Sequence, residues 1–464
     1  MDDIQGKIVM TPLEENILKS EILLKIHVTL QKVKTLSHDT FPTIGPQKLL
    51  LLSERILEQI KRRYKSFNFT QMFFIKTGIL KLIIELISYI EYSTIKNVTW
   101  SIIPAYNRLF KSLLKDTEYI IVPQWGEIYA IRNKNLIDDF LFYLQSPGLI
   151  FEVDAPKENI NKILEDISAK IYLIKYSRLE KLSALHMALL GHEIGHIFAS
   201  KWMDEEYSKF VYGTTLSVRL KEIVMEELKK EKLTDGMPMK SLIMMKLNSY
   251  NNLIKKNYSE LLSDIFGCAL FGHTYIVAMY LFSSITDDLD DSNWYKGYLS
   301  WRFRLQNCIR FLSFVVKKHN LRLDTYDLYE SICSTVKGDI KDLQAHDVCN
   351  LLVASFIAKE EEIFETICTY SKSELFVKRI DIQQIETARD RLQHGIIPNA
   401  MIKDGDECPI DIRNILFAIW LVSYEKSEDD IQSFSDHIQH YNLLGIKGIE
   451  LSVEQEEYND FVKK

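Results

Sequence analysis

The segment that most constrains this 464-residue chain is Gly191-His192-Glu193-Ile194-Gly195-His196, inside an apolar helical run that begins near Leu182. Positions four apart lie on one face of a helix, so His192 and His196 are expected to offer imidazole nitrogens to one metal ion. Glu193 falls beside them, where a carboxylate can take a proton from an activated water. The alternative is a pair of buried histidines held by hydrogen bonds. A zinc site needs a third protein ligand and an open position for water.

A second segment, residues 257–267, supplies a matching pattern of carboxylates. Glu260 and Asp264 are also four apart, and their neighbours are apolar: Leu261, Leu262, Ile265 and Phe266. Two adjacent buried carboxylates are unfavourable unless a cation or a proton donor accounts for both. Zinc bound by Glu260 and an imidazole N–H bound by Asp264 would satisfy each. The alternative is an exposed pair on an amphipathic helix.

Together, the motif His192-Glu193-x-x-His196 and the later Glu260-x-x-x-Asp264 resemble the gluzincin group of zinc metallopeptidases, which includes thermolysin. The resemblance covers about residues 182–272. It implies that His192, His196 and Glu260 are zinc ligands, that Glu193 is the general base, and that Asp264 is the partner of His192. The two helices are more than sixty residues apart, farther than in thermolysin and closer to the neutral and membrane-associated peptidases with long insertions.

Two other assignments of the metal site fit the sequence less well. The metzincin pattern is not met, because Ala199 and Trp202 stand where it needs Gly and a third His. Three acids in the intervening region are rival third ligands, but they lie among lysines, as on a solvent-facing helix: Glu222, Glu226 and Glu227. That region predicts helices at 214–232 and 238–254, split by a Thr-Asp-Gly turn, and could act as a lid.

Residues that follow Asp264 are candidates for stabilising the oxyanion formed in peptide hydrolysis. His273 and Tyr275 place an imidazole and a phenol close behind the proposed ligand helix. Arg302 and Arg304 belong to a segment with a faint resemblance to a late arginine stretch of some gluzincin relatives, although its His-Pro is absent. Such donors act beside the zinc. The alternative for each is a structural role.

The remaining periodicity predicts a helical scaffold with a small sheet. Apolar residues recur at helical intervals over 16–33, 47–64 and 73–92. β-rich runs at 118–123 and 127–132 flank a hairpin-like turn, a helix is expected at 136–144, and a third strand at 149–153. In gluzincins, a sheet edge before the metal-binding helix pairs with extended substrate. A purely structural sheet is the alternative.

Bulk properties describe an ordinary globular protein, with 47% hydrophobic and 26% charged residues. The net charge of −7 argues against a nucleic-acid partner, and the basic run at 61–65 is interpreted as a solvated helix end. Six scattered cysteines without CxxC indicate reduced thiols and a cytoplasmic protein. The amino terminus lacks a secretory signal, and the apolar stretch 266–285 is interpreted as a buried helix rather than a membrane span.

The sequence therefore predicts a predominantly helical α+β protein with a zincin-like catalytic core, in which a small β-sheet precedes the HExxH helix. We expect an N-terminal helical region at 1–115, the core at 116–290 with a helical insertion at about 205–255, and a C-terminal helical region at 291–464.

The predicted function is zinc-dependent hydrolysis of a protein or peptide substrate, with Glu193 as general base and Zn²⁺ as cofactor. One alternative is a regulatory or toxin/defence-type protein that binds a partner through its helical flanks with little or no peptidase activity. A zinc-stabilised structural protein is a third interpretation, which would leave Glu193 without a task.

Overall fold

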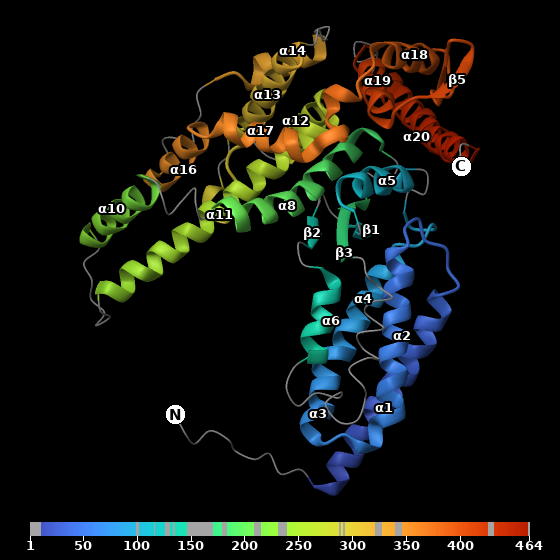
Figure 1. Ribbon diagram of the computed structural model, residues 1–464, viewed down its shortest axis with the longest axis vertical. Helices are drawn as coiled ribbons and strands as arrows, with labels where there is room; N and C mark the ends of the chain where they lie inside the picture. Colours follow the sequence, from blue (N-terminus) through green and yellow to red (C-terminus); the bar gives the residue numbers. More distant parts are fainter. Residues whose placement is uncertain are drawn as a thin grey trace. The chain divides into compact units, whose positions relative to one another are not determined.

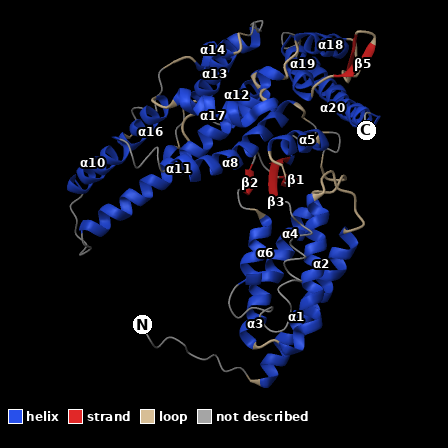
Figure 2. Cartoon of the chain, viewed as in Figure 1, coloured by secondary structure: helices blue, strands red, loops and turns tan. Residues whose placement is uncertain are grey.

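The computed structural model is mostly helical and contains one small mixed sheet, which confirms the expected α+β, predominantly helical class (Figures 1 and 2). The chain divides into two compact units: unit 1 is residues 1–107 and 114–181, and unit 2 is residues 108–113 and 182–464. The three-region division expected from the sequence stays a prediction. The structure describes residues 11–98, 102–115, 117–125, 130–132, 135–145, 170–178, 183–207, 215–230, 239–286, 289–290, 293–320, 327–338, 346–425 and 431–462.

Unit 1 is built on helices that bury one apolar face each. The helices expected over 16–33, 47–64 and 73–92 are all present, and a π-helical segment divides the last of them. Thr11 caps the first helix by accepting a hydrogen bond from the Glu14 amide, and the Glu14 carboxylate accepts from the Thr11 amide. The elements are α1 (Pro12–Leu36), α2 (Gly45–Arg63), η1 (Tyr64–Ser66), α3 (Phe69–Phe74), η2 (Ile75–Ile79), α4 (Leu80–Tyr92) and α6 (Leu136–Gln145), while α5 (Ile103–Leu113) is shared by the two units.

The sheet of unit 1 contains β1 (Thr117–Gln124), β3 (Lys170–Ser177) and β2 (Ala130–Arg132), in the order β1-β3-β2. β3 runs parallel to β1 and antiparallel to β2. The expected hairpin between the first two strands is therefore wrong, because β3 lies between them. Ile171 and Leu173 of β3 are buried, as befits a central strand. The expected strand at 149–153 lies outside the described residues.

Unit 2 holds the two helices that carry the motifs, α8 (Leu190–Trp202) and α11 (Met239–Phe271). The helix expected at 238–254 is the first part of α11, which continues without a break to Phe271. Gly272, with a φ of +54°, separates it from the next helix. The other elements are η4 (Leu185–Leu189), η5 (Met203–Tyr207), α10 (Thr215–Lys230), α12 (His273–Thr286), η6 (Trp294–Lys296), α13 (Trp301–Lys318), α14 (Asp327–Val336), α16 (Asp347–Ile357), α17 (Glu360–Ser371), η7 (Lys372–Glu374), η8 (Phe376–Lys378), α18 (Ile382–Gln393), β4 (Ala400–Lys403), β5 (Asp406–Pro409), α19 (Ile412–Glu425) and α20 (Ile431–Val462).

Small residues bring α8 and α11 into close contact. A Cβ on Gly195 would lie 2.6 Å from the Cα of Ser263, and one on Gly191 would lie 3.1 Å from the Cα of Gly267. Helix backbones approach this closely only where side chains are absent or minimal. The glycines of the motif segment therefore determine the separation of the two helices that carry the candidate ligands.

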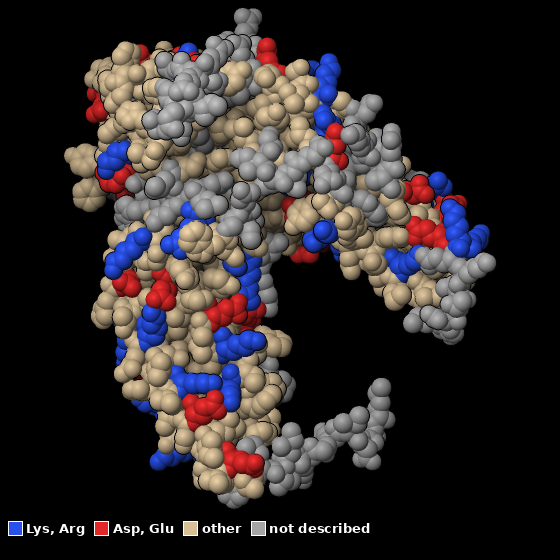
Figure 3. Space-filling model, turned by 180° about the vertical axis from the view of Figure 1, so that it is seen from behind, with Lys and Arg blue, Asp and Glu red and all other residues tan. Residues whose placement is uncertain are grey.

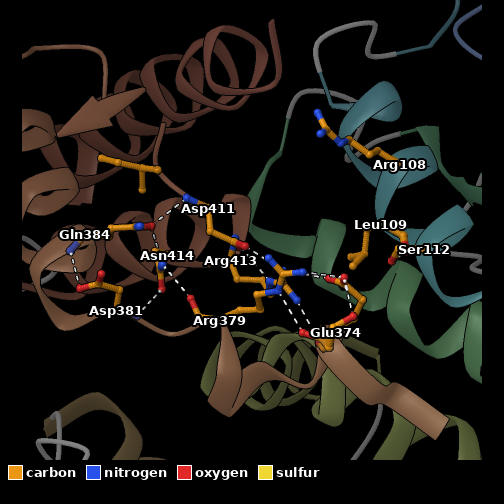
Figure 4. Close-up of polar contacts among 12 residues, drawn as sticks. Arg108, Leu109, Ser112, Glu374, Arg379, Asp381, Gln384, Asp411, Arg413 and Asn414 are labelled. Atoms are coloured by element: carbon orange, nitrogen blue, oxygen red, sulfur yellow. Dashed lines mark hydrogen bonds and ion pairs between the residues drawn. The ribbon is translucent and has the colours of Figure 1, made fainter. Parts of the chain in front are cut away.

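A buried polar network stabilises the C-terminal part of unit 2 (Figure 4). Arg413 is 4% exposed and donates to both carboxylate oxygens of Asp411 and to the carbonyl oxygen of Glu374. Arg379 donates to the Glu374 carboxylate at 2.8 Å, and Asn414 bridges the Arg379 carbonyl and Gln384. Because its buried charges are paired, this network is a structural feature rather than a candidate site.

Among the described helices, none combines the length and the apolar character that a membrane span requires. On the face drawn in Figure 3, acidic and basic side chains of unit 1 are interspersed.

Candidate metal centre

The structure brings His192, His196 and Glu260 together. One ligand atom of each lies within 4.8 Å of the others. His192 Nε2 is 3.3 Å from Glu260 Oε2, and His196 Nε2 is 3.7 Å from Glu260 Oε1. The two imidazoles come from successive turns of α8, and the carboxylate comes from α11. Two imidazoles and a carboxylate form a donor set that suits zinc and leaves a position open.

The far nitrogen of His192 is held by Asp264. His192 Nδ1 lies 2.8 Å from Asp264 Oδ1, so an N–H at this position donates to the carboxylate and leaves Nε2 facing Glu260. Asp264 also accepts two hydrogen bonds from Arg304, at 2.6 and 2.9 Å, and one from Tyr275 at 2.9 Å. Orientation of an imidazole by a hydrogen-bonded carboxylate is typical of metal sites.

Hydroxyl groups hold His196 in the corresponding way. Ser263 donates to the carbonyl oxygen of Ser259 at 2.7 Å, so its Oγ is available to accept from His196 Nδ1, 2.9 Å away. The Ser259 Oγ is 3.2 Å from the same nitrogen. Nε2 of His196 then carries the lone pair on the side of Glu260. The partner at Nδ1 of each histidine therefore leaves Nε2 as the nitrogen that would bind a metal ion.

The charges of the site shift its pKa values in opposite directions. Burial lowers the pKa of His192, but the carboxylates of Asp264 and Glu260 outweigh it and raise the pKa to about 10. Burial and the charge of His192 lower the pKa of His196 to about 4. Burial would raise the pKa of Glu260, yet His192 lowers it below its usual value. Without metal, a proton shared among these groups takes the place of a cation.

Glu193 is the buried carboxylate that the hydrogen bonds of the site leave incomplete. It is 1% exposed, and its Oε2 has no hydrogen-bond partner among the described residues. Burial raises its pKa to about 7. The charge of Glu260 acts in the same direction, whereas the charge of His192 lowers this pKa. A buried acid that titrates near neutrality is typical of a group that accepts and returns a proton.

The rival acids have other partners. Glu222 is exposed and pairs with Arg219 at 2.8 Å. Glu227 accepts a hydrogen bond from Tyr250 at 2.7 Å and pairs with Lys246 and His346. Glu226 is also exposed. The described contacts place only Glu260, among these four acids, against the two imidazoles.

The expected oxyanion donors lie in different surroundings. Tyr275 and Arg304 are 1% and 4% exposed, and both donate to Asp264. His273 is buried against the rings of Tyr329, Phe376 and Phe417. Arg302 pairs with Asp290 and donates to backbone carbonyls. Their role as oxyanion donors stays a prediction.

Tyr298 is a further candidate for the site, because the charges of Glu260 and Glu193 influence its pKa, and the sequence did not indicate it. Lys256, one turn before Glu260 on α11, lies over its ring at 5.6 Å and donates to the carbonyl of Lys296 at 2.6 Å. Burial raises the pKa of Tyr298, and the carboxylates of Glu260 and Glu193 raise it further. Tyr298 is nevertheless 43% exposed, unlike Tyr275. No periodicity or spacing in the chain distinguishes this tyrosine from the others.

Comparison of the chain with protein-family models, curated proteins and solved structures finds no match.

Proposed function

We propose that unit 2 contains a zincin-like core of the gluzincin type and hydrolyses peptide bonds in a protein or peptide substrate in the cytoplasm. The observation that most supports this proposal is that His192, His196 and Glu260 lie close together beside the buried Glu193. They come from two helices that are far apart in the sequence. The three side chains would hold Zn²⁺, and Asp264 and Ser263 would keep the imidazoles oriented. Zinc supplies a Lewis acid that polarises a carbonyl and lowers the pKa of water.

Each residue of the candidate site has a definite role in this proposal. The Glu193 carboxylate takes the proton of the attacking water and later gives it to the leaving amine. The unpaired Oε2 provides the acceptor for that proton. Arg304 and Tyr275 keep Asp264 ionised and fixed. We assign to Tyr298 the donation of a hydrogen bond to the developing oxyanion, because burial and the carboxylates of Glu260 and Glu193 keep its phenol protonated.

The test compares metal content and digestion of a peptide library in wild type and three variants. Glu193→Gln is expected to retain zinc and to lose at least about 100-fold in rate, because it removes the base and keeps the ligands. Glu260→Ala is expected to lose both zinc and hydrolysis. Glu222→Ala, an exposed acid paired with Arg219, is the matched control and should behave as wild type.

The outcomes separate the proposal from its alternative. Zinc in the wild type, with hydrolysis that a chelator abolishes, supports the peptidase. Zinc without hydrolysis of any library peptide indicates the regulatory alternative, in which the helical flanks bind a protein partner. Equal loss of zinc in the Glu193 and Glu260 variants would contradict the assigned roles.

A further inference from the structure

Helix α1 carries two apolar faces, only one of which belongs to the core. Ile22, Ile26 and Val33 are buried in unit 1. A second set, which we call the α1 stripe, is 56–69% exposed: Leu13, Ile17, Leu24 and Val28. At 3.6 residues per turn these four positions fall within about 60° of one another, roughly opposite the core face, over about 22 Å. A soluble helix normally has one such face.

Ion pairs to neighbouring helices establish that the stripe points outward. Lys76 pairs with Glu21 at 2.8 Å and Glu91 pairs with Lys32 at 2.6 Å, which places η2 and α4 along one flank of α1. Lys34 lies 3.5 Å from Glu58 of α2, on the opposite flank. The stripe lies between these flanks. Two further apolar side chains, Phe73 and Ile84, are 52% and 48% exposed on the α3–α4 side.

The charges of α1 determine which partner fits the stripe. Acids outnumber bases in the first part of the helix, where Glu14, Glu15 and Glu21 stand with one lysine, Lys19, that pairs with Glu15. The second part carries only basic charges, at Lys25, Lys32 and Lys34. A second α1 in antiparallel orientation opposes acid to base, whereas a parallel one opposes like charges. Ser20, a small exposed residue, stands near the middle of the stripe and permits a close crossing.

We propose that the α1 stripe is the interface of a homodimer in which two α1 helices pack antiparallel about a two-fold axis near Ser20. In this register Leu13 meets Val28 of the second copy and Ile17 meets its Leu24, so the contact is self-complementary, as a two-fold axis requires. Lys25 of the second copy then lies opposite residue 16, two residues from Glu14, which is an axial offset of about 3 Å that the two side chains can span. Glu21, near the axis, is already neutralised by Lys25 and Lys76.

The first test is sedimentation equilibrium of the full chain across the micromolar range. Wild type is expected to dimerise, and Leu24→Asp to raise the dissociation constant by about 30-fold or more, because it places a charge in the centre of the contact. Ile402→Asp, on an apolar residue of β4 that is 67% exposed, is the matched control and should dimerise as wild type. Circular dichroism of each variant verifies that the fold is retained.

The second test addresses the orientation. Glu14→Lys is expected to weaken the dimer, and adding Lys25→Glu to the same chain should restore it, because the pair is exchanged across the axis. Both chains lose the helix cap at Thr11, and the single variant Lys25→Glu measures the loss of the pair with Glu21 in the same chain, so the complete double-mutant cycle reports the intermolecular contact.

Three results would overturn the proposal: a monomer throughout, a dimer indifferent to Leu24→Asp, or a double variant no tighter than Glu14→Lys. Co-sedimentation of a monomer with anionic vesicles would assign the stripe to a membrane surface instead.

Discussion

Asp264 links the candidate metal centre to the rest of unit 2 at the scale of single residues. It accepts hydrogen bonds from His192, Tyr275 and Arg304 while almost fully buried. A buried carboxylate is costly unless it is paired. Although burial raises the pKa of Asp264, the guanidinium of Arg304 and the imidazole of His192 outweigh it and hold that pKa well below its usual value. The charge that orients His192 is therefore permanent in the pH range of the folded protein.

Replacement of Tyr298 by Phe tests the oxyanion donor. We expect kcat to fall by about 100-fold with KM little changed, because the hydrogen bond forms only as the oxyanion develops. Zinc content should stay at the wild-type level. Steady-state kinetics with one cleaved peptide measure the effect, and Tyr295→Phe, on a 56% exposed tyrosine of the same segment, is the control. A change in KM alone would assign Tyr298 to substrate binding.

At this scale, local spacing was enough to predict which candidate site residues share a helix face. His192 with His196, and Glu260 with Asp264, share helix faces because helical geometry alone places residues four apart together. The contacts of Ser263 with His196 and of Arg304 with Asp264 depend on how α8, α11 and α13 pack, which no local pattern encodes. Tyr298 lies on a connecting segment without periodicity, and therefore gave no signal.

At the scale of helices, Gly195→Ala tests the close approach of α8 and α11. Alanine favours a helix by about 1 kcal/mol relative to glycine, but its Cβ would meet the Ser263 backbone at 2.6 Å. Because backbone atoms cannot move aside as a flexible side chain can, we expect a net loss of about 1–3 kcal/mol in the free energy of unfolding and weaker zinc binding. Urea unfolding and zinc titration measure the two effects.

Gly338→Ala is the matched control for that substitution. Among the residues that the structure describes, a Cβ at Gly338 would meet only the Arg302 side chain, at 3.5 Å, which is an ordinary contact. Unchanged stability and unchanged zinc affinity in Gly195→Ala would show that the close approach of α8 and α11 does not depend on the missing side chain at this position.

Helices were easier to predict than strand order. Apolar periodicity located α1, α2 and the α3–α4 segment because each buries one face. The proximity in sequence of the two β-rich runs suggested a hairpin, but a strand some forty residues later pairs with both. The position of β3 between these two strands depends on its tertiary burial and has no local sequence signature. The sequence also did not predict that the helix expected at 238–254 continues into the helix that carries Glu260. One continuous helix and two shorter ones give the same hydrophobic periodicity.

At the scale of the whole molecule, His273 predicts a pH dependence of stability. Burial lowers its pKa to about 4 in the folded chain, against about 6.5 when unfolded. Between these values the unfolded chain binds more protons, so the stability contribution is complete above pH 6.5 and is lost as pH falls to 4. We expect His273→Phe, which keeps a ring against Phe376 and Phe417, to remove about 3 kcal/mol of this loss.

Urea titrations of wild type and variant from pH 4 to 7 measure the difference. His319→Gln, on an exposed histidine of unit 2, is the control for the removal of one imidazole. Parallel curves for wild type and His273→Phe would contradict the prediction. Since Nδ1 of His273 has no hydrogen-bond partner within the described part of the chain, we also expect the variant to lose little stability at neutral pH.

The continuity of α11 limits how the region around α10 can work as a cover. Met239 and Glu260 belong to one uninterrupted helix, about 31 Å apart at 1.5 Å per residue. Because α11 has no break, a displacement of its first turns also moves Glu260 relative to the imidazoles of α8. Under the proposed function, a partner that binds the first turns of α11 would therefore change how Glu260 holds the metal ion.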